Sequence, residues 1–524
     1  MKTTSAIRIL SGLLFLIAAI SARSATTLVL PGTKVQYAVN AAADGDVLVL
    51  LEGIYNEDVT VQGKNVRIVR EKGKTVEISG SLTYRDVNGT VVIRDLKIGR
   101  DGSKHLTIEN CEKVGVEDLD LSAGGGLVIT NSTVVARSCQ FVGNATFNNS
   151  ADSNATIEVI DCTFGGILST TDADLKMVKV VFTSGADSGI TRGKALLYDV
   201  RFDNNAHDVV IDGTDWRMHE CYVGESLLVT NAHTRFIRSR TRVHLYHNSP
   251  TLPDGNGTEC TVFQSQIGEL LRCRAQRSWI GYNTIRYITY DDVGSTEAEI
   301  VGNDVAGRDV ATQLIYVNAP NLEVNISNNV IRNSWNGNER HGVGLWKCQK
   351  ATIRNNEFNH CHGDGVHIQG DFGGSAEVTG NFFYTTQDHI IEAPFANVLF
   401  THNFWETYNN HTIDWVVGGV VSGEGNLKAN AGLSDYNRDH ADRFAVWASI
   451  PDSLKDKGPP EAHFKDHDGT RNDIGPLGGH AYDPNGKTSV KPVVLSGDHW
   501  PKVILKGTSE KINIKARAAV ATPK

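Results

Sequence analysis

Short runs of alternating apolar and polar residues recur along most of the chain. Residues 351–354 and 377–379 are examples, and glycine, asparagine and aspartate separate one run from the next. Alternation with a period of two is typical of strands that bury one face, and the separating residue types are typical of turns. The pattern therefore predicts an all-β protein of short strands and tight turns.

A repeat organises these strands. An asparagine recurs every 20 to 27 residues, and in all but the last case an apolar residue follows it two places later; the positions are Asn283, Asn303, Asn329, Asn356, Asn381, Asn403 and Asn426. Earlier units keep the spacing with an apolar marker, at Ile98, Leu121, Phe141, Phe164, Phe182, Phe202 and Val223. A unit this short with three strands is one coil of a parallel β-helix, in which equivalent side chains stack and asparagines hydrogen-bond in a ladder. The sequence predicts a single β-helix of about fifteen coils over residues 25–430.

The two ends of the chain read differently from the repeat. Lys2 and Arg8 precede an apolar run at residues 9–20, and small residues follow this run. This order predicts a secretory signal peptide over residues 1–24, and hence a secreted protein. No later stretch has the apolar length of a membrane span. Residues 431–524 lack the repeat and are expected to form an irregular C-terminal cap and extension.

Composition narrows the possible functions. The chain has 524 residues, 40% hydrophobic and 21% charged, with a formal charge of −9 and only 13 prolines. These values exclude a disordered chain and argue against nucleic acid as a partner. Few prolines and no low-complexity linker favour one large domain, which we expect to be a monomer.

The eight cysteines show neither a CxxC pair nor a spacing with histidine that binds zinc. Cys139 and Cys162 occupy the same place in successive repeats. Small buried residues stacked from coil to coil are therefore the favoured interpretation, although an exported protein can also form disulfides.

The start of the repeat resembles a known superfamily. Residues 35–43 form a short amphipathic segment that is expected to be a capping helix, and residues 44–50 and 53–55 follow it as a first coil. This stretch resembles the N-terminal coil of the pectate-lyase-like superfamily of right-handed parallel β-helices. The resemblance implies the fold, and it implies a binding cleft along the first strand of each coil. It leaves the activity open, because the superfamily contains lyases, hydrolases, esterases, epimerases and adhesins.

Candidate chemistry falls on four successive first strands. His341, Asp364, Asp388 and His411 each lie two residues before such a strand, and His367 and Asp414 take outward positions within two of them. Coils rise by about 4.8 Å, so Asp364 and Asp388 are expected side by side. Neighbouring carboxylates can serve as acid and base because repulsion separates their pKa values. The alternative is that polar residues at these turns satisfy only the local backbone.

The same residues resemble the polygalacturonase series in order and approximate spacing. The matching segments are residues 363–366, 387–389 and 410–412, with His389 in place of that family's second aspartate. The resemblance implies that Asp364 and Asp388 are catalytic and that His411 supports them, with His367 as an assisting group. Expected substrate contacts on these coils are His341, His389, Asp414, Trp346 and Trp415, since aromatic faces stack on sugars.

Arginines form a second candidate feature. Arg235, Arg238, Arg240 and Arg242 are followed one coil later by Arg272, Arg274 and Arg277. Their alternation predicts a basic face suited to uronate or sulfate groups, with Arg240, Arg272 and Arg274 as substrate contacts. In this interpretation His244 or Arg272 would abstract a proton during β-elimination. The alternative is a solvated face paired with acids such as Glu269 and Asp291.

The expected function is hydrolysis of an acidic polysaccharide outside the cytoplasm. The alternatives are a polysaccharide lyase that uses the arginines, and a surface or adhesion scaffold without catalysis. No cofactor is implied by a motif. Ca²⁺ is considered only for the Asp-x-Asp-Gly run at 466–469, where a capping turn is favoured because the twelve-residue calcium-loop spacing is absent. No nucleotide-binding glycine loop is present.

Overall fold

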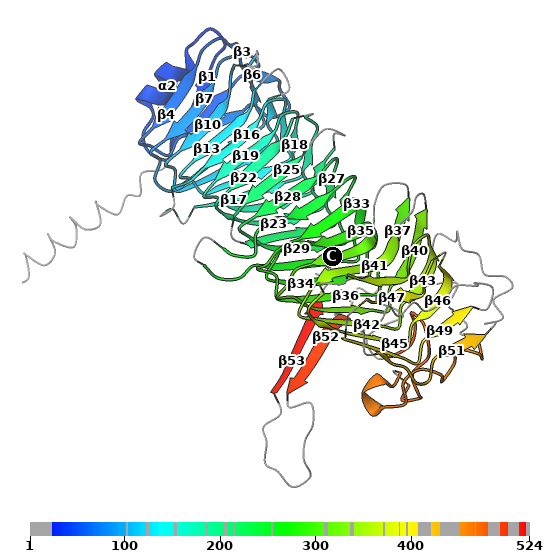
Figure 1. Ribbon diagram of the computed structural model, residues 1–524. Coiled ribbons are helices and arrows are strands. Elements are labelled where there is room, and N and C mark those ends of the chain that lie inside the picture. The colour runs from blue at the N-terminus through cyan, green and yellow to red at the C-terminus, as the bar shows by residue number, and fades with distance from the viewer. Residues whose placement is uncertain are drawn as a thin grey trace, which may run out of the picture. The chain divides into compact units, whose positions relative to one another are not determined.

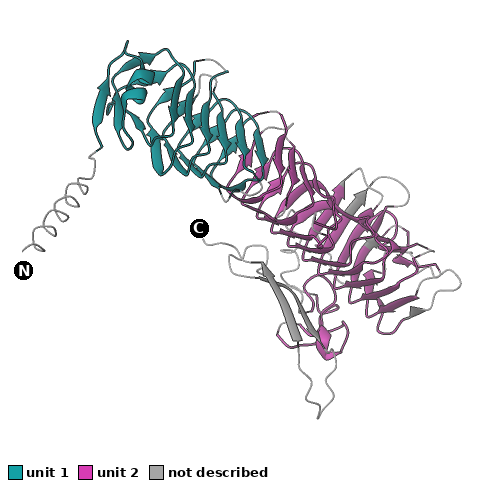
Figure 2. Cartoon of the chain, turned by 90° about the vertical axis from the view of Figure 1, so that its left-hand side faces the viewer, with its two compact units in different colours: residues 1–183 teal, residues 184–524 magenta. Residues whose placement is uncertain are grey.

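A computed structural model gives the fold. It describes residues 24–100, 103–121, 125–150, 153, 155–184, 186–203, 208–213, 215–252, 255–308, 313–335, 340–369, 372–386, 388–394, 397–406, 421–429, 451–466, 468–479, 493–500 and 513–519. Two compact units divide the chain, residues 1–183 and 184–524 (Figure 2). The predicted signal peptide, and His411, Asp414 and Trp415, lie outside the described residues.

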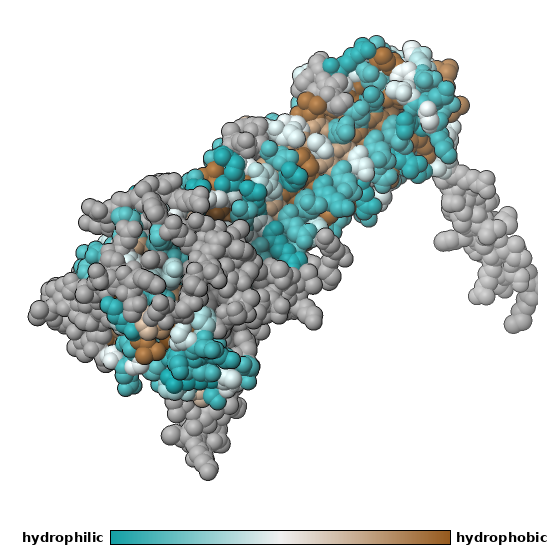
Figure 3. Space-filling view, turned by 90° about the vertical axis from the view of Figure 1, so that its right-hand side faces the viewer, coloured by the Kyte–Doolittle hydropathy of each residue, from teal (hydrophilic) through white to brown (hydrophobic). Residues whose placement is uncertain are grey.

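The fold prediction is confirmed, because the described strands form a parallel β-helix of about 16 turns. Each coil contributes three strands, and each strand pairs in parallel with its equivalents in the neighbouring coils (Figure 1). Side chains that point inward are buried and those that point outward are less so. In residues Val366–Ile368, for example, both end residues are buried and His367 between them is half-buried. On the face drawn in Figure 3, the described residues are mostly hydrophilic, with hydrophobic residues in smaller patches.

The first unit contains the expected helix near its start, where α2 (Val35–Ala41) buries Val35 and Val39. Its first strands are β4 (Val59–Gln62), β7 (Leu82–Arg85), β10 (Leu106–Glu109), β13 (Leu127–Thr130), β16 (Ala145–Asn148) and β19 (Leu168–Thr171). Its second strands are β1 (Thr26–Val29), β2 (Val47–Leu50), β5 (Arg67–Arg70), β8 (Thr90–Arg94), β11 (Lys113–Glu117), β14 (Val134–Arg137), β17 (Thr156–Ile160) and β20 (Asp174–Val178). Its third strands are β3 (Gly53–Tyr55), β6 (Val76–Ile78), β9 (Lys97–Ile98), β12 (Asp120–Leu121), β15 (Gln140–Phe141), β18 (Thr163–Phe164) and β21 (Val181–Phe182).

The second unit keeps the same plan. Its first strands are β22 (Ser188–Thr191), β25 (Val209–Asp212), β28 (Leu227–Thr230), β31 (Leu245–His247), β38 (Gln313–Asn318), β41 (His341–Lys347), β44 (Val366–Ile368) and β47 (Ile391–Glu392). Its second strands are β23 (Lys194–Tyr198), β26 (Asp215–His219), β29 (His233–Ile237), β32 (Glu259–Phe263), β34 (Arg277–Gly281), β36 (Glu297–Val301), β39 (Glu323–Ser327), β42 (Lys350–Arg354), β45 (Ser375–Thr379), β48 (Asn397–Thr401) and β50 (Val421–Ser422). Its third strands are β24 (Arg201–Phe202), β27 (Tyr222–Val223), β30 (Arg240–Thr241), β37 (Asp304–Arg308), β40 (Val330–Trp335), β43 (Glu357–Cys361), β46 (Phe382–Thr386), β49 (Phe404–Glu406) and β51 (Leu427–Ala429). In two coils, the third strand of one turn continues into the first strand of the next as β33 (Gln266–Cys273) and β35 (Thr284–Tyr290).

The asparagine ladder is present as predicted. From Asn283 to Asn403, each ladder asparagine donates both its backbone N–H and its side-chain amide to the Oδ1 atom of the next, at 2.9 to 3.3 Å. The residue before each asparagine has a positive φ, as in Asn328 (57°) and Gly302 (69°). Together the two residues turn the chain from the second strand into the third while their polar groups stay satisfied.

Stacking also organises the interior of the first unit. The rings of Phe141 and Phe164 stack with centroids 4.8 Å apart, and Phe164 and Phe182 follow at 5.1 Å. All eight cysteines are buried and none of them forms a disulfide, and the backbone N–H of Cys139 donates to Sγ of Cys162 at 3.4 Å. The cysteines are therefore core residues, and Cys139 and Cys162 stack in successive coils as the repeat predicted.

The C-terminal segment at 451–479 packs against the second unit beside the ladder. The side-chain amide of Asn355 donates to Oδ1 of Asn472 and to the carbonyl of Asp473, and that of Asn328 donates to the carbonyl of Gly478. The carboxylate of Asp466 accepts the backbone N–H groups of Asp473 and Gly479. These contacts fit the capping turn, and a short 3-10 helix, η1 (Ala462–Phe464), lies within the same segment. Further on, β52 (Val493–Trp500) and β53 (Asn513–Ala519) form an antiparallel pair.

None of the helices among the described residues combines the length and the apolar character that crossing a membrane requires.

Candidate active site

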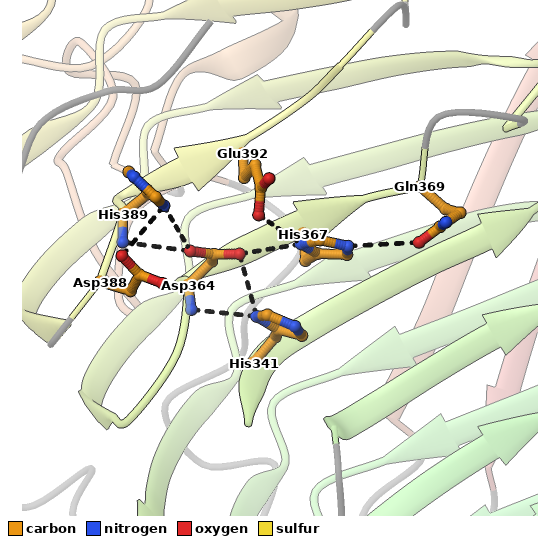
Figure 4. A network of polar contacts seen from close by, with 7 residues as sticks. All are labelled: His341, Asp364, His367, Gln369, Asp388, His389 and Glu392. Carbon is orange, nitrogen blue, oxygen red and sulfur yellow. Dashed lines mark hydrogen bonds and ion pairs between the residues drawn. The ribbon is translucent and has the colours of Figure 1, made fainter. Parts of the chain in front are cut away.

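The candidate site lies where β41, β44 and β47 stack. Val343 pairs with Val366, and Val366 pairs with Ile391, so these apolar residues form one inward column. The outward neighbours His367 and Glu392 form a second column beside it. His341 and Asp364 precede the inward residues on their own coils, which brings both side chains to the edge of this face (Figure 4).

One sequence prediction about this register is wrong. Because Val366 pairs with Ile391 and not with Ile390, His389 stands next to Asp364 in the column, and Asp388 is displaced from it. A shift of one residue turns a side chain to the other face of a strand. The side chain of Asp388 is accordingly 62% exposed, whereas that of Asp364 is fully buried.

Asp364 is the centre of the site. Its Oδ2 atom lies 3.0 Å from Nδ1 of His341 and 2.9 Å from Nδ1 of His367, and its Oδ1 atom lies 3.0 Å from Nδ1 of His389. The backbone N–H of His389 also donates to Oδ1, at 3.1 Å. Three imidazoles on three successive coils thus converge on one buried carboxylate, as Figure 4 shows.

The two histidines on the Oδ2 side support each other. The rings of His341 and His367 stack with centroids 4.1 Å apart and an interplanar angle of 16°. Nδ1 of His341 also accepts the backbone N–H of Asp364 at 3.0 Å. These contacts fix both ring planes, so the nitrogens beside Asp364 are held in place before any ligand arrives.

Glu392 is a second carboxylate in the cluster, and the sequence did not single it out. Its Oε2 atom lies 2.9 Å from Nδ1 of His367, and 29% of its side chain is exposed. Glu392 and Asp388 both lie beside His389, since Asp388 Oδ1 is 3.3 Å from Nδ1 of His389 and Glu392 belongs to the same close group. The accessible carboxylates are therefore Glu392 and Asp388.

The environment separates the acidities of these groups. Burial alone would raise the pKa of Asp364, but its hydrogen bonds with His341 and His367 hold that pKa well below its ordinary value. Burial lowers the pKa of His367, but the hydrogen bond with Asp364 and the charges of Asp364 and Glu392 together outweigh this effect, so the net shift is upward. Burial and the neighbouring charge of Asp364 raise the pKa of Glu392. Asp364 thus loses its proton more readily, and Glu392 less readily, than an ordinary carboxyl group.

Two overlapping groups in this site have the composition of metal ligands. His341, Asp364 and His367 each offer one ligand atom, and these atoms lie within 4.8 Å of one another. Asp364, His389 and Glu392 meet the same criterion. The stacking of adjacent coils therefore brings nitrogen and oxygen donors together from separate parts of the sequence. No short sequence motif would reveal this grouping.

Aromatic residues extend from the cluster along the same face. The half-buried Trp346 ring lies 5.5 Å from the His367 ring and 5.2 Å from the Tyr316 ring. A Cβ atom on Gly344 would approach the Trp346 ring to 2.6 Å, so glycine makes room for the indole. Tyr246 follows in the outward column further along the first strands.

The prediction that the arginines form one basic face is wrong. Arg235 lies on the second strand β29 and Arg240 on the third strand β30, because the chain turns between them. Both Arg272 and Arg274 contact the carboxylate of Asp291, and Arg277 pairs with Glu259 at 2.7 Å. Arg240 lies over the Tyr222 ring at 5.9 Å. The alternative, arginines paired with nearby acids such as Asp291, fits these contacts.

Comparison with known proteins adds little to this geometry. No family model matches the chain, and no curated protein matches it. Among solved structures, tailspike protein 3 of bacteriophage CBA120 aligns with 12% identity over 78% of this chain and 60% of its own, with a TM-score of 0.21. The receptor-binding protein of bacteriophage Det7, a tailspike, aligns with 10% identity over 78% of each chain, with a TM-score of 0.18. Similarity this low assigns neither a family nor a function, so the parallel β-helix itself is what the chain is shown to be.

Proposed function

We propose that the protein hydrolyses a polysaccharide at the Asp364 cluster, with Glu392 as general acid and Asp388 as general base. The observation that carries the proposal is the pair of unlike carboxylates around one buried aspartate. Glu392 is partly exposed and has a raised pKa, whereas Asp388 is mostly solvated. Two carboxyl groups, one of them in surroundings that favour its protonated form, are the machinery of glycoside hydrolysis.

Asp364 has a different role in this proposal from the one its sequence suggested. Its side chain is fully buried, so it acts through the imidazoles that it holds. We therefore assign Asp364, His341 and His367 as positioning residues. Burial and the ionised Asp364 nearby disfavour the charged form of Glu392, which suits Glu392 to the role of proton donor.

The reaction follows from these assignments. Glu392 gives its proton to the glycosidic oxygen as the bond to the anomeric carbon breaks. Asp388 accepts a proton from the water that attacks that carbon from the other side, and the configuration inverts. A proton returned from solvent to Glu392, and one lost from Asp388, restore both groups.

Residues on the same face support a saccharide substrate. Trp346 and Tyr316 offer partly exposed rings beside His367, and aromatic faces stack on sugar rings. Arg286 on β35 is half-exposed, and its nearest carboxylate, Glu269, lies 3.7 Å away. A cation with so loose a partner suits an acidic sugar, which is the preferred substrate class in this proposal.

The test is incubation of the mature protein with acidic and neutral polysaccharides, followed by assays for new reducing ends and for the ultraviolet absorbance of unsaturated sugars. Hydrolysis yields reducing ends alone, and both Glu392→Gln and Asp388→Asn should abolish most of them. Reducing ends together with unsaturated sugars would instead indicate β-elimination and reject the assigned roles. His244→Ala, on the same face but outside the cluster, is the matched control.

A non-catalytic scaffold is the second candidate, and one observation favours it. Asp364 is buried and accepts a backbone N–H, as a purely structural turn residue would. Under this alternative the wild type would release no sugar from any polysaccharide, and an oligosaccharide that does bind would bind the Glu392→Gln variant equally well.

A further inference from the structure

We propose that His341, Asp364 and His367 bind a divalent first-row transition-metal ion. The proposal concerns the same site as the hydrolysis above but does not rest on it, because the coordinating atoms are defined without reference to a substrate. Glu392 and His389 stand next to this set and complete its surroundings.

The spacing of the donor atoms fits an ion. Metal bonds to imidazole nitrogen and carboxylate oxygen are about 2.0 to 2.2 Å long, so two donors at right angles around an ion stand about 3 Å apart. The Nδ1 atoms of His341 and His367 lie 3.0 and 2.9 Å from Oδ2 of Asp364. The donors therefore have the separations of neighbouring ligands around one ion.

The orientation of His341 points in the same direction. Its Nδ1 atom faces Asp364 and lies 3.0 Å from both the backbone nitrogen and the Oδ2 atom of that residue. The ring nitrogen nearest the carboxylate is therefore the one that would face an ion shared with Oδ2.

Burial strengthens the argument. The side chain of Asp364 is fully buried and that of His341 is 7% exposed. Buried carboxylates are stable when they are paired with a charge or coordinate a metal. In addition, a Cβ atom on Gly363 would stand 2.9 Å from Nδ1 of His341, so glycine at this position leaves that nitrogen accessible.

The donor set selects the class of ion. Two imidazole nitrogens and one carboxylate oxygen suit Zn²⁺, Co²⁺ or Mn²⁺, whereas Ca²⁺ takes six to eight oxygen donors. We therefore expect Zn²⁺ and Co²⁺ to bind and Ca²⁺ not to compete with them.

The experiment is calorimetric titration of tag-free protein, first dialysed against a chelator, with Zn²⁺, and a parallel titration with Co²⁺ followed by its visible absorption. We expect one ion per chain with an intensified Co²⁺ spectrum. Loss of a coordinating side chain in His341→Ala or His367→Ala should weaken binding by about 100-fold or more, at least as much as the 10- to 100-fold loss that outer-shell changes cause.

Controls separate this proposal from misfolding and from the proposed hydrolysis. His244→Ala removes a histidine from the same face and should leave Zn²⁺ affinity unchanged. Circular dichroism of each variant in chelator reports whether the fold survives. If His341→Ala and His367→Ala, both folded, bind Zn²⁺ as tightly as the wild type, or if the wild type does not bind it, the proposal is rejected. The titrations contain no polysaccharide, so an inactive protein that binds the ion would reject the hydrolysis alone.

Discussion

At the scale of single residues, the site depends on one buried carboxylate that fixes three imidazoles and shapes the acidity of a neighbour. Asp364 contacts His341, His367 and His389, and its charge raises the pKa of Glu392. A buried carboxylate with several polar partners affects both stability and chemistry, because removing the carboxylate leaves those buried partners without a hydrogen-bond acceptor.

Glu392→Gln tests the acid at this scale. Glutamine keeps the shape but carries no transferable proton, so the turnover number should fall by about 10² to 10⁴. Since the pKa of Glu392 is raised, the alkaline limb of the wild-type rate profile should lie above the ordinary glutamate pKa of about 4.3. The measurement is kcat/KM against pH for both proteins, and a Gln variant that retains the full rate and the same limb would exclude Glu392 as the acid.

Asp364→Asn tests the centre of the cluster through stability. The lowered pKa of Asp364 means that its contribution is present above the unfolded value of about 3.9 and is lost as the pH falls toward the folded value. The raised pKa of His367 means that its contribution is present in full below about 6.5 and is lost as the pH rises through the folded value. The stabilisation is therefore largest between about pH 4 and 6.5.

Urea unfolding in chelator provides the measurement for this variant. The midpoint difference between wild type and Asp364→Asn should be larger at pH 5.5 than at pH 8.5. An equal difference at the two values would show that the carboxylate and His367 are not coupled in the folded state.

At the scale of elements, the ladder determines how coils join. The side-chain amide of Asn329 donates to Ile300, Ser327 and Asn356, and its Oδ1 accepts two N–H groups from Asn303. All of these hydrogen bonds are buried, so water cannot replace them when the amide is removed. A ladder of this kind holds the second and third strands of neighbouring coils at one spacing.

Asn329→Ala should consequently destabilise the second unit strongly. With each lost hydrogen bond contributing about 0.5 to 1.5 kcal/mol, the change should cost about 3 kcal/mol or more in the free energy of unfolding. Asn426→Ala is the matched control, because this asparagine is partly exposed, accepts from Asn403 and donates to the carbonyl of Phe400, and so has fewer hydrogen bonds than Asn329 among the described residues. Chemical denaturation of both variants gives the comparison, and equal losses would contradict a cooperative ladder.

The elements also show how far the sequence could predict this site. The ladder, the first strands at Val343 and Val366 and the cluster partners His341, Asp364 and His367 followed from the repeat, because period and turn chemistry are local properties. The position of His389 did not follow. The chain covers 13 residues from Val343 to Asn356 but 12 from Ile391 to Asn403, so counting back from the ladder displaces the register by one. The loop length that absorbs the difference has no signature in a single sequence.

At the scale of the whole molecule, a distant segment completes the second unit. Asn472 lies 117 residues from Asn355 along the chain, yet each side-chain amide donates to the other's oxygen, at 2.9 and 3.2 Å. Because Asn355 immediately precedes a ladder asparagine, the segment at 451–479 binds where coils turn. This contact could not be predicted from periodicity, since the segment has no repeat.

The acidity of Asp466 makes this docking dependent on pH. Burial raises the pKa of Asp466 to about 6, so the docked segment holds a proton that the undocked carboxylate would release near its ordinary value of about 3.9. A raised pKa for an acid means that stability falls as the pH rises from about 4 to about 6 and then stays constant. Hydrogen exchange should therefore be slower across residues 451–479 at pH 5 than at pH 7.5, after correction for the intrinsic rates. Asp466→Asn carries no titratable group and should remove most of this difference, because asparagine keeps an oxygen for the N–H groups of Asp473 and Gly479. If the pH dependence persists unchanged in that variant, another group controls the docking of the segment.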